Sequence, residues 1–198
     1  MMATKTLPAW RTKLQASLQR HEGVPFSKFF QLATIKPDGR PSNRTVVFRG
    51  FLEGTNDIQL VSDIRYNKVA EAARNPAAEV AWYFTDSREQ YRLSGLLTMV
   101  GPDHENQALQ DARAAVWRGM SDKARAQYLW PAPGAPKTGK EEMPQQPPPA
   151  ADQPPLPTFC LSVLSVKEVD YYETNGQTRY KYSLDGSGDS WQELELNA

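Results

Sequence analysis

The chain has 198 residues, enough for one domain with a hydrophobic core or for a domain with a small extension. Its 23 acidic and 23 basic residues balance, which excludes a strong overall field that would attract nucleic acid or an anionic membrane. No apolar run approaches the roughly 20 residues of a membrane span, and the N-terminus lacks the apolar core of a signal peptide. We therefore expect a single domain over residues 1–198 in the cytoplasm, without nucleic-acid or membrane partners.

Cysteine and histidine give no signature of a metal site or a nucleophile. The single cysteine, Cys160, cannot form an intrachain disulfide, and its apolar neighbours predict a buried structural thiol. The two histidines, His21 and His104, have no cysteine at metal-ligand spacing. The sequence thus predicts no metal site, and we expect both histidines at the surface.

The first third of the chain predicts a helix followed by a hairpin. Pro8 suits the first turn of a helix, and apolar residues then repeat every four positions, which indicates a helix over residues 8–20. A strand over 29–35 leads into a turn signal at 36–39, and a second strand returns over 42–51.

The middle of the chain alternates between strands and helices. The pattern predicts a strand, a short helix and a second hairpin, over residues 57–62, 65–74, 78–85 and 90–100. Pro76 disfavours a helical residue before it, so the short helix should end there. Asp103 and Ser121 are each placed to cap a further helix.

Residues 131–157 differ in character, because ten of these 27 residues are proline. Such a proline-rich insert lacks backbone donors and has little to bury, so it is either an extended excursion or a ligand for a proline-recognition domain. Strands resume over 159–174, 177–184 and 190–196, with Asn175-Gly176 as a hairpin signal between the first two. At least six antiparallel strands with a few helices predict an α+β protein built on a closed or split β-barrel.

Cations gather on two neighbouring segments. Arg44 lies on a predicted strand, while Ser62, Arg65 and Lys68 span the end of the next strand and the first turn of a helix. A helix N-terminus attracts anions, and arginine and lysine both suit phosphate oxygens. The alternative is that these side chains solvate the rim of the sheet.

A third polar group lies on the strand predicted over 90–100. Gln90 and Arg92 share one face of it, and a glutamine amide can both donate and accept hydrogen bonds. As an alternative, both side chains are simply exposed on an edge strand.

Three blocks of the chain, in order and at matching spacing, resemble the FMN-binding segments of the pyridoxamine 5'-phosphate oxidase-like flavoproteins. They are residues 41–50, 60–68 and 90–95, and the agreement extends over about 25–101. Residues 169–172 and 179–182 agree more loosely. The stretch 128–134 and the proline-rich insert resemble one subgroup of this family.

The resemblance implies a six-stranded split barrel with peripheral helices, of the FMN-binding type, in which FMN supplies the chemistry and no protein group is catalytic. It implies that Arg44, Ser62 and Lys68 hold the FMN phosphate, assisted by Arg65 or Asn67. The flavin ring would contact the residues Val46, Val47, Val61, Gln90 and Tyr172. It also implies a homodimer with FMN at the subunit interface.

The resemblance further implies an oxidoreductase that passes a hydride from a small-molecule substrate, such as a phosphorylated B6 vitamer, to FMN, with reoxidation by oxygen. Arg49, Arg179 and Lys181 would line the substrate side. Tyr172 and Ser183 depart from the tryptophan and arginine of true oxidases, and Lys181 replaces a histidine. The alternatives are therefore an FMN-binding or carrier protein, a flavin or F420-type reductase, and a barrel without cofactor that binds partners through the proline-rich insert.

Overall fold

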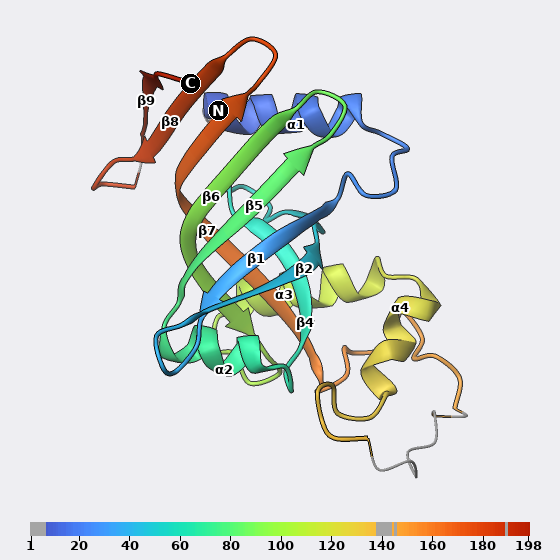
Figure 1. Ribbon diagram of the computed structural model, residues 1–198. Coiled ribbons are helices and arrows are strands. Elements are labelled where there is room, and N and C mark those ends of the chain that lie inside the picture. Colours follow the sequence, from blue (N-terminus) through green and yellow to red (C-terminus); the bar gives the residue numbers. More distant parts are fainter. Residues whose placement is uncertain (1–6, 138–143, 145, 189) are drawn as a thin grey trace, which may run out of the picture.

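The computed structural model describes residues 7–137, 144, 146–188 and 190–198 (Figure 1). Within these ranges lie four α-helices, one 3-10 helix and nine strands. In chain order they are α1 (Ala9–Arg20), β1 (Phe29–Ile35), β2 (Pro41–Val47), β3 (Gly50–Phe51), β4 (Ile58–Asp63), α2 (Asn67–Arg74), β5 (Ala77–Phe84), β6 (Glu89–Val100), α3 (Gln107–Arg118), α4 (Asp122–Ala126), η1 (Gln127–Leu129), β7 (Phe159–Glu173), β8 (Thr178–Leu184) and β9 (Trp191–Leu196). The part of the proline-rich insert at 138–143 and 145 lies outside the described residues.

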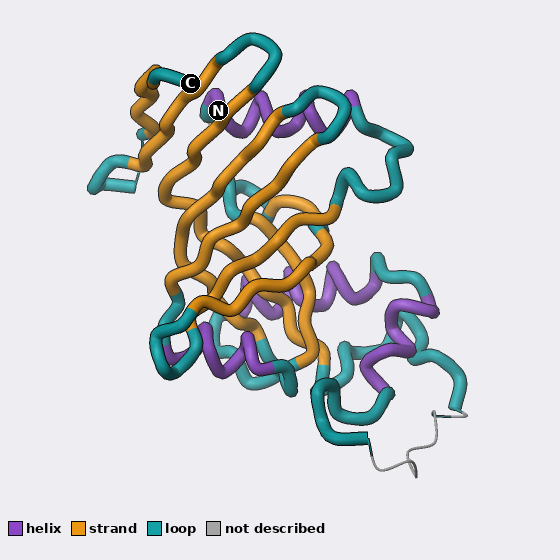
Figure 2. The backbone as a smooth tube through the Cα atoms, viewed as in Figure 1, coloured by secondary structure: helices purple, strands orange, loops and turns teal. Residues whose placement is uncertain are grey.

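The strands form one antiparallel sheet in the order β2-β1-β5-β6-β7-β4-β3, and β8 and β9 continue from β7. The sheet curls, as Figure 2 shows, until β2 approaches β4. The six strands from β2 to β4 correspond to the expected six-stranded barrel. The total is nine because β3, β8 and β9 extend the sheet.

The long strand β7 joins the two parts of the sheet. Its first residues pair with β4, from Phe159 opposite Asp63 to Leu164 opposite Ile58. Its last residues pair with β8, and almost its whole length pairs with β6. A strand of 15 residues is long enough to serve both neighbours.

Strand alternation places a large aromatic core inside the curl. On β5 the buried positions alternate with exposed ones, so Val80, Trp82 and Phe84 all point inward. From α1, Trp10 and Leu14 complete this core, and both are fully buried. Each such side chain contributes about 2–3 kcal/mol by leaving water.

Figure 1 shows α1 and the C-terminal hairpin at one end of the sheet and α2 at the other. Trp10 of α1 packs edge-on against Trp191 of β9, with ring centroids 5.3 Å apart. The expected surface position of His21 is wrong. Its ring is buried against Phe84, and Nδ1 lies 2.7 Å from the Ser17 carbonyl. Burial of Cys160 is confirmed, and it raises the pKa of that thiol to about 11.

Two of the expected helix starts were misplaced. The helix after β6 begins with Asn106 as its cap, not Asp103, because the Asn106 side chain accepts the Leu109 N–H at 3.2 Å. The helix after β4 begins at Asn67 rather than near 65, because the Asp63 carboxylate accepts the backbone N–H of Arg65 in a turn. Ser121 caps α4 as expected, by accepting the Ala124 N–H.

Candidate functional site

A pocket of about 610 Å³ opens where β4 ends and α2 begins. Strand β2 forms one side of it, and residues 127–134 form the other. Four cations and one acid line the pocket, so its charge favours an anion. It brings together the predicted site residues Arg44, Val46, Val47, Arg49, Val61, Ser62, Arg65, Asn67 and Lys68.

Lys68 is the strongest sign of an anion site. Its side chain is buried, and it has no ion pair or hydrogen bond within the described part of the chain. Burial and the nearby charge of Arg44 lower its pKa to about 8. Its ammonium lies 4.2 Å from the centroid of the Tyr66 ring. A buried ammonium without a counter-ion is costly, and a bound anion would relieve that cost.

Contacts within the chain fix the orientation of the Arg44 side chain. Its guanidinium donates to the Thr34 hydroxyl at 2.6 Å, the Leu32 carbonyl at 3.1 Å and the Ser42 hydroxyl at 2.6 Å. It also forms an ion pair of 3.0 Å with the buried carboxylate of Glu71. These contacts use both terminal nitrogens fully, so only the Nε–H remains for a ligand.

Arg65 also contacts groups of its own chain, but its partners differ from those of Arg44. It forms a bidentate ion pair with Asp63, at 2.8 and 2.6 Å, and donates to the Trp130 carbonyl at 3.1 Å. The carboxylate raises the pKa of the Arg65 guanidinium, which therefore stays charged. Its charge is largely balanced by Asp63, unlike that of Lys68.

The remaining residues form a polar floor and an apolar wall. Ser62 is buried, and its hydroxyl donates to the Asp63 carbonyl at 3.0 Å. No side chain caps α2, so its first amide groups need a partner from outside the helix. Val47 and Val61 are half-buried in the wall, whereas Val46 belongs to the hydrophobic core.

Four predicted residues, Gln90, Tyr172, Arg179 and Lys181, do not line this pocket. Gln90, Tyr172 and Arg179 are cross-strand neighbours on β6, β7 and β8. A continuous row of paired residues leads from the pocket to Lys181: Thr45, Gln31, Ala81, Arg92, Asp170 and Lys181. At about 4.8 Å per strand this row spans roughly 24 Å along the sheet. Within one chain, these residues are therefore remote from Lys68.

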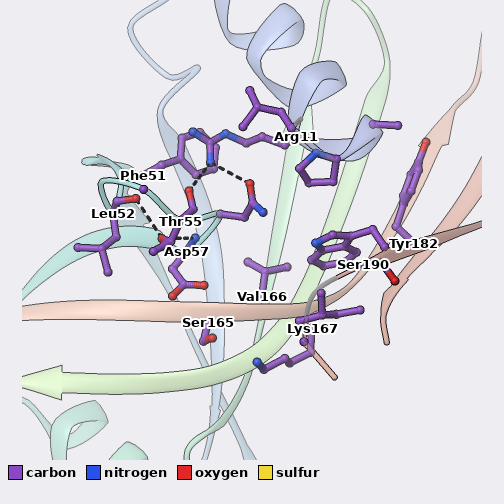
Figure 3. A pocket seen from close by; sticks show the side chains of 18 of the residues that line it. Arg11, Phe51, Leu52, Thr55, Asp57, Ser165, Val166, Lys167, Tyr182 and Ser190 are labelled. Carbon is purple, nitrogen blue, oxygen red and sulfur yellow. Dashed lines mark hydrogen bonds between the residues drawn. The ribbon is translucent and has the colours of Figure 1, made fainter. Parts of the chain in front are cut away.

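A larger cavity, of about 850 Å³, lies beside the start of α1 and contains none of the predicted site residues. Figure 3 shows Arg11 there, with its guanidinium over the Phe51 ring at 3.1 Å. Arg11 also donates to the Thr55 carbonyl at 3.1 Å, so it ties α1 to the β3–β4 turn. We assign this arginine a structural role. A third cavity, of about 580 Å³, shares Val47 and Arg49 with the candidate site and is bounded by α3.

Sequence reasoning missed three contributors to the pocket: Glu71, Asp63 and Trp130. Glu71 lies on α2, and its partner Arg44 lies 27 positions earlier, so no local spacing predicts their contact. Asp63 and Trp130 are partners of Arg65, and only the folded chain brings Trp130 to it. Among the described residues there is no cluster of acids, histidines and cysteines that could hold a metal ion, and no helix long and apolar enough to cross a membrane.

Comparison with known proteins gives the family. A family model described as the FMN-binding domain of pyridoxamine 5'-phosphate oxidase matches residues 7–101. Pyridoxine/pyridoxamine 5'-phosphate oxidase 2 of Arabidopsis thaliana is 34% identical over 199 residues, covering 99% of this chain and 100% of that protein. The chain belongs to the pyridoxamine 5'-phosphate oxidase-like family. The matched residues 7–101 include Arg44, Lys68 and Gln90 but not Trp130, Arg179 or Lys181.

Solved structures agree with this oxidase-like family. A pyridoxamine 5'-phosphate oxidase-related, FMN-binding protein from Nostoc punctiforme superimposes with a TM-score of 0.92 at 38% identity, covering 98% of this chain and 100% of that one. PhzG from Burkholderia lata superimposes with a TM-score of 0.74 at 17% identity, covering 98% of both chains, and shows the fold alone. The expected α+β split-barrel fold is thereby confirmed.

Proposed function

We propose that this oxidase-like chain binds FMN in the pocket between β2, β4 and α2 and works as an FMN-dependent oxidoreductase. The observation that carries the proposal is the buried ammonium of Lys68, which forms no ion pair with any acid that the structure describes and lies beside the uncapped start of α2. A phosphate suits that position better than any neutral group, because it supplies both charge and acceptors.

The residues present fit this cofactor. Lys68, Ser62, Asn67 and the first amides of α2 would hold the phosphate, and Arg44 would add its Nε–H. Val47 and Val61 would flank the flavin ring, with Val46 packed behind them. When bound, FMN would supply the redox chemistry, namely acceptance of a hydride from the substrate carbon that bears the amine or alcohol and reoxidation by oxygen. The protein supplies position, charge and exclusion of water.

We also propose a homodimer in which a second copy completes each site. Gln90, Tyr172, Arg179 and Lys181 are remote from the pocket of their own chain but lie on the outer face of the sheet. Tyr83 and Leu194 share that face and are 52% and 59% exposed. A face with large exposed apolar side chains is typical of an interface. Two copies related by a two-fold axis would form two equivalent sites.

For the substrate we propose a phosphorylated B6 vitamer, in keeping with the name of the Arabidopsis relative. Arg49 is exposed and lines both the FMN pocket and the adjoining cavity beside α3, so it would face the substrate. Arg179 and Lys181 of the second copy would bind the substrate phosphate.

One observation favours a second candidate, an FMN-binding protein or flavin reductase without B6 oxidase activity. Arg179 forms a two-pronged ion pair with Asp170, at 3.1 and 2.8 Å, and Lys181 pairs with Glu168 at 2.8 Å. Both cations are therefore partly neutralised within the chain. A substrate phosphate would have to compete with two carboxylates for them.

The deciding experiment is an anaerobic visible spectrum of FMN-loaded protein before and after addition of pyridoxamine 5'-phosphate. Bleaching of the flavin band, restored by air, would support the oxidase. A bound flavin that keeps its yellow colour would favour the second candidate. Failure to bind FMN would overturn the cofactor assignment itself.

A further inference from the structure

The segment 127–134, here called the Trp130 wall, encloses the pocket on the side opposite β2. Five of its residues besides Trp130 line the pocket: Gln127, Tyr128, Pro131, Pro133 and Gly134. Trp130 itself is 43% exposed, which leaves a large part of its indole without a protein contact. An aromatic side chain held half-exposed at the mouth of a pocket is available to contact a ligand there.

The wall is firmly anchored on its inner side. Tyr128 is buried, with its ring centroid 5.7 Å from that of Trp117 and 5.0 Å from that of Phe159. The Thr158 hydroxyl donates to the Tyr128 carbonyl at 2.9 Å. Two prolines in the segment restrict its backbone further. The exposed indole therefore stands on a rigid base.

Arg65 connects this wall to the end of β4. The Arg65 guanidinium donates to both carboxylate oxygens of Asp63, at the end of β4. Its other terminal nitrogen donates to the Trp130 carbonyl at 3.1 Å. Asp63 is itself buried, so the pair forms a fixed bracket. Arg65 therefore holds the wall, while Lys68 is a buried cation of the same pocket that forms no ion pair within the described residues.

We propose that Trp130 covers flavin bound in this pocket and slows its release, and that Arg65 is a positioning residue which holds Trp130 in place. This inference rests on the proposed function, because it assumes that the pocket binds FMN. It gives Arg65 a role other than direct contact with the phosphate. It also assigns a function to residues 128–134, which do not contribute to the proposed phosphate site.

The test compares FMN with riboflavin, which has the same ring and no phosphate. Release of each flavin is followed by the recovery of its fluorescence after rapid dilution. Trp130→Ala and Arg65→Ala should each speed the release of both flavins by a similar factor, about tenfold for the loss of one or two contacts. Lys68→Ala should speed the release of FMN only.

Arg40→Ala is a matched control, because Arg40 pairs with Asp38 at the same two-residue spacing but lies in an exposed turn outside the pocket. It should leave both release rates unchanged. Arg65→Lys keeps the charge beside Asp63 but loses the fork, so it should resemble Arg65→Ala even if the latter folds poorly.

Three results would overturn the proposal. Faster release of FMN alone in the Arg65 variants would make Arg65 a phosphate ligand. Unchanged release of both flavins in Trp130→Ala would show that Trp130 does not cover the flavin. Effects that add in the double variant R65A/W130A would show that Arg65 does not act through Trp130, whereas a double variant no faster than Trp130→Ala supports the link. A wild-type protein that binds neither flavin would instead refute the proposed function and the inference with it.

Discussion

Lys68 and Arg44 bring two positive charges into one pocket, close enough for the Arg44 guanidinium to lower the pKa of the Lys68 ammonium. In the part of the chain that the structure describes, Arg44 alone of these two forms an ion pair, with Glu71 at 3.0 Å. The three side chains together carry one uncompensated positive charge in a largely buried place. The fold therefore stores an unfavourable interaction that a bound anion would relieve.

Lys68→Ala tests the phosphate assignment directly. Loss of a charge-assisted contact should weaken FMN binding by about 1.5–3 kcal/mol, with little effect on riboflavin. Fluorescence titration of both flavins measures this difference. Lys123→Ala, at an exposed position on α4, is the control. An unchanged FMN affinity in Lys68→Ala would place the phosphate elsewhere.

The depressed pKa of Lys68 predicts a dependence on pH. Folding lowers this pKa from about 10.4 in the unfolded chain to about 8. Between these values the unfolded chain holds a proton that the folded chain has released, so the free energy of unfolding of the FMN-free protein should rise with pH across that window. Below pH 8 the cost of burying the charge is present in full.

FMN affinity should change in the opposite direction. Above pH 8 the free protein must take up a proton on Lys68 when phosphate binds, so the dissociation constant should rise with pH, by up to about tenfold per unit. Urea unfolding and flavin titration at pH 7, 8, 9 and 10 measure the two trends. In Lys68→Met, both the free energy of unfolding and the FMN dissociation constant should lose this dependence on pH. A pH dependence that persists in this variant would point to another titrating group.

Arg44→Ala should affect stability as well as FMN. It leaves the Glu71 carboxylate, which is 5% exposed, with the Thr34 hydroxyl as its one hydrogen-bond partner among the described side chains. Removing one member of a buried ion pair costs about 3 kcal/mol, so the free energy of unfolding without FMN should fall by that amount. The double variant R44A/E71Q removes the stranded charge and should recover most of this loss. Equal stability of the single and double variants would contradict the pairing.

Arg179→Ala separates the two candidate functions. If Arg179 binds the substrate phosphate, this change should raise KM for pyridoxamine 5'-phosphate and spare both FMN affinity and the KM for unphosphorylated pyridoxamine. If Arg179 only partners Asp170, the two substrates should be affected alike. Steady-state oxygen uptake with each substrate measures the difference.

Gly95 gives a prediction about the barrel. It lies at the bulge where β6 and β7 shift register, and an added Cβ would lie 2.1 Å from the Ser165 carbonyl oxygen. Because both atoms belong to paired strands, Gly95→Ala should cost about 3 kcal/mol, the upper end for overpacking. Gly186→Ala, where an added Cβ meets nothing within 4 Å, should be neutral. Urea unfolding of the two variants tests this contrast.

Local sequence patterns located most of the strands, because alternation and turn residues act over a few positions. The one strand expected over 42–51 was wrong, since the structure divides it into β2 (Pro41–Val47) and β3 (Gly50–Phe51). The strand at 29–35 and the break at Pro76 follow from such signals alone. Helix starts were less accurate, since Asp103 and Asn106 are both suitable caps and only the packing of the helix selects between them. His21 was misplaced because its burial depends on Phe84, which is far away in sequence.

The residues of the candidate site also differ in how far local sequence could predict them. Arg44, Ser62 and Lys68 could be named because their blocks are short and their spacing is regular. Their partners could not be inferred, since Glu71 reaches Arg44 across 27 positions and Trp130 reaches Arg65 across 65. The roles of Gln90 and Arg179 stay predictions, because the pocket of their own chain does not include them.

Thr158 joins the two ends of the segment that contains the proline-rich insert. Its hydroxyl binds the Tyr128 carbonyl, and its own carbonyl accepts the Ile64 N–H at 2.8 Å, so the chain leaves and rejoins the barrel at one point. Because the two ends are in contact, the entropy cost of closing the loop between them changes only slowly with its length. Related proteins can therefore gain, lose or change residues between Gly134, the last residue of this stretch that lines the pocket, and Thr158 while the candidate pocket keeps its shape.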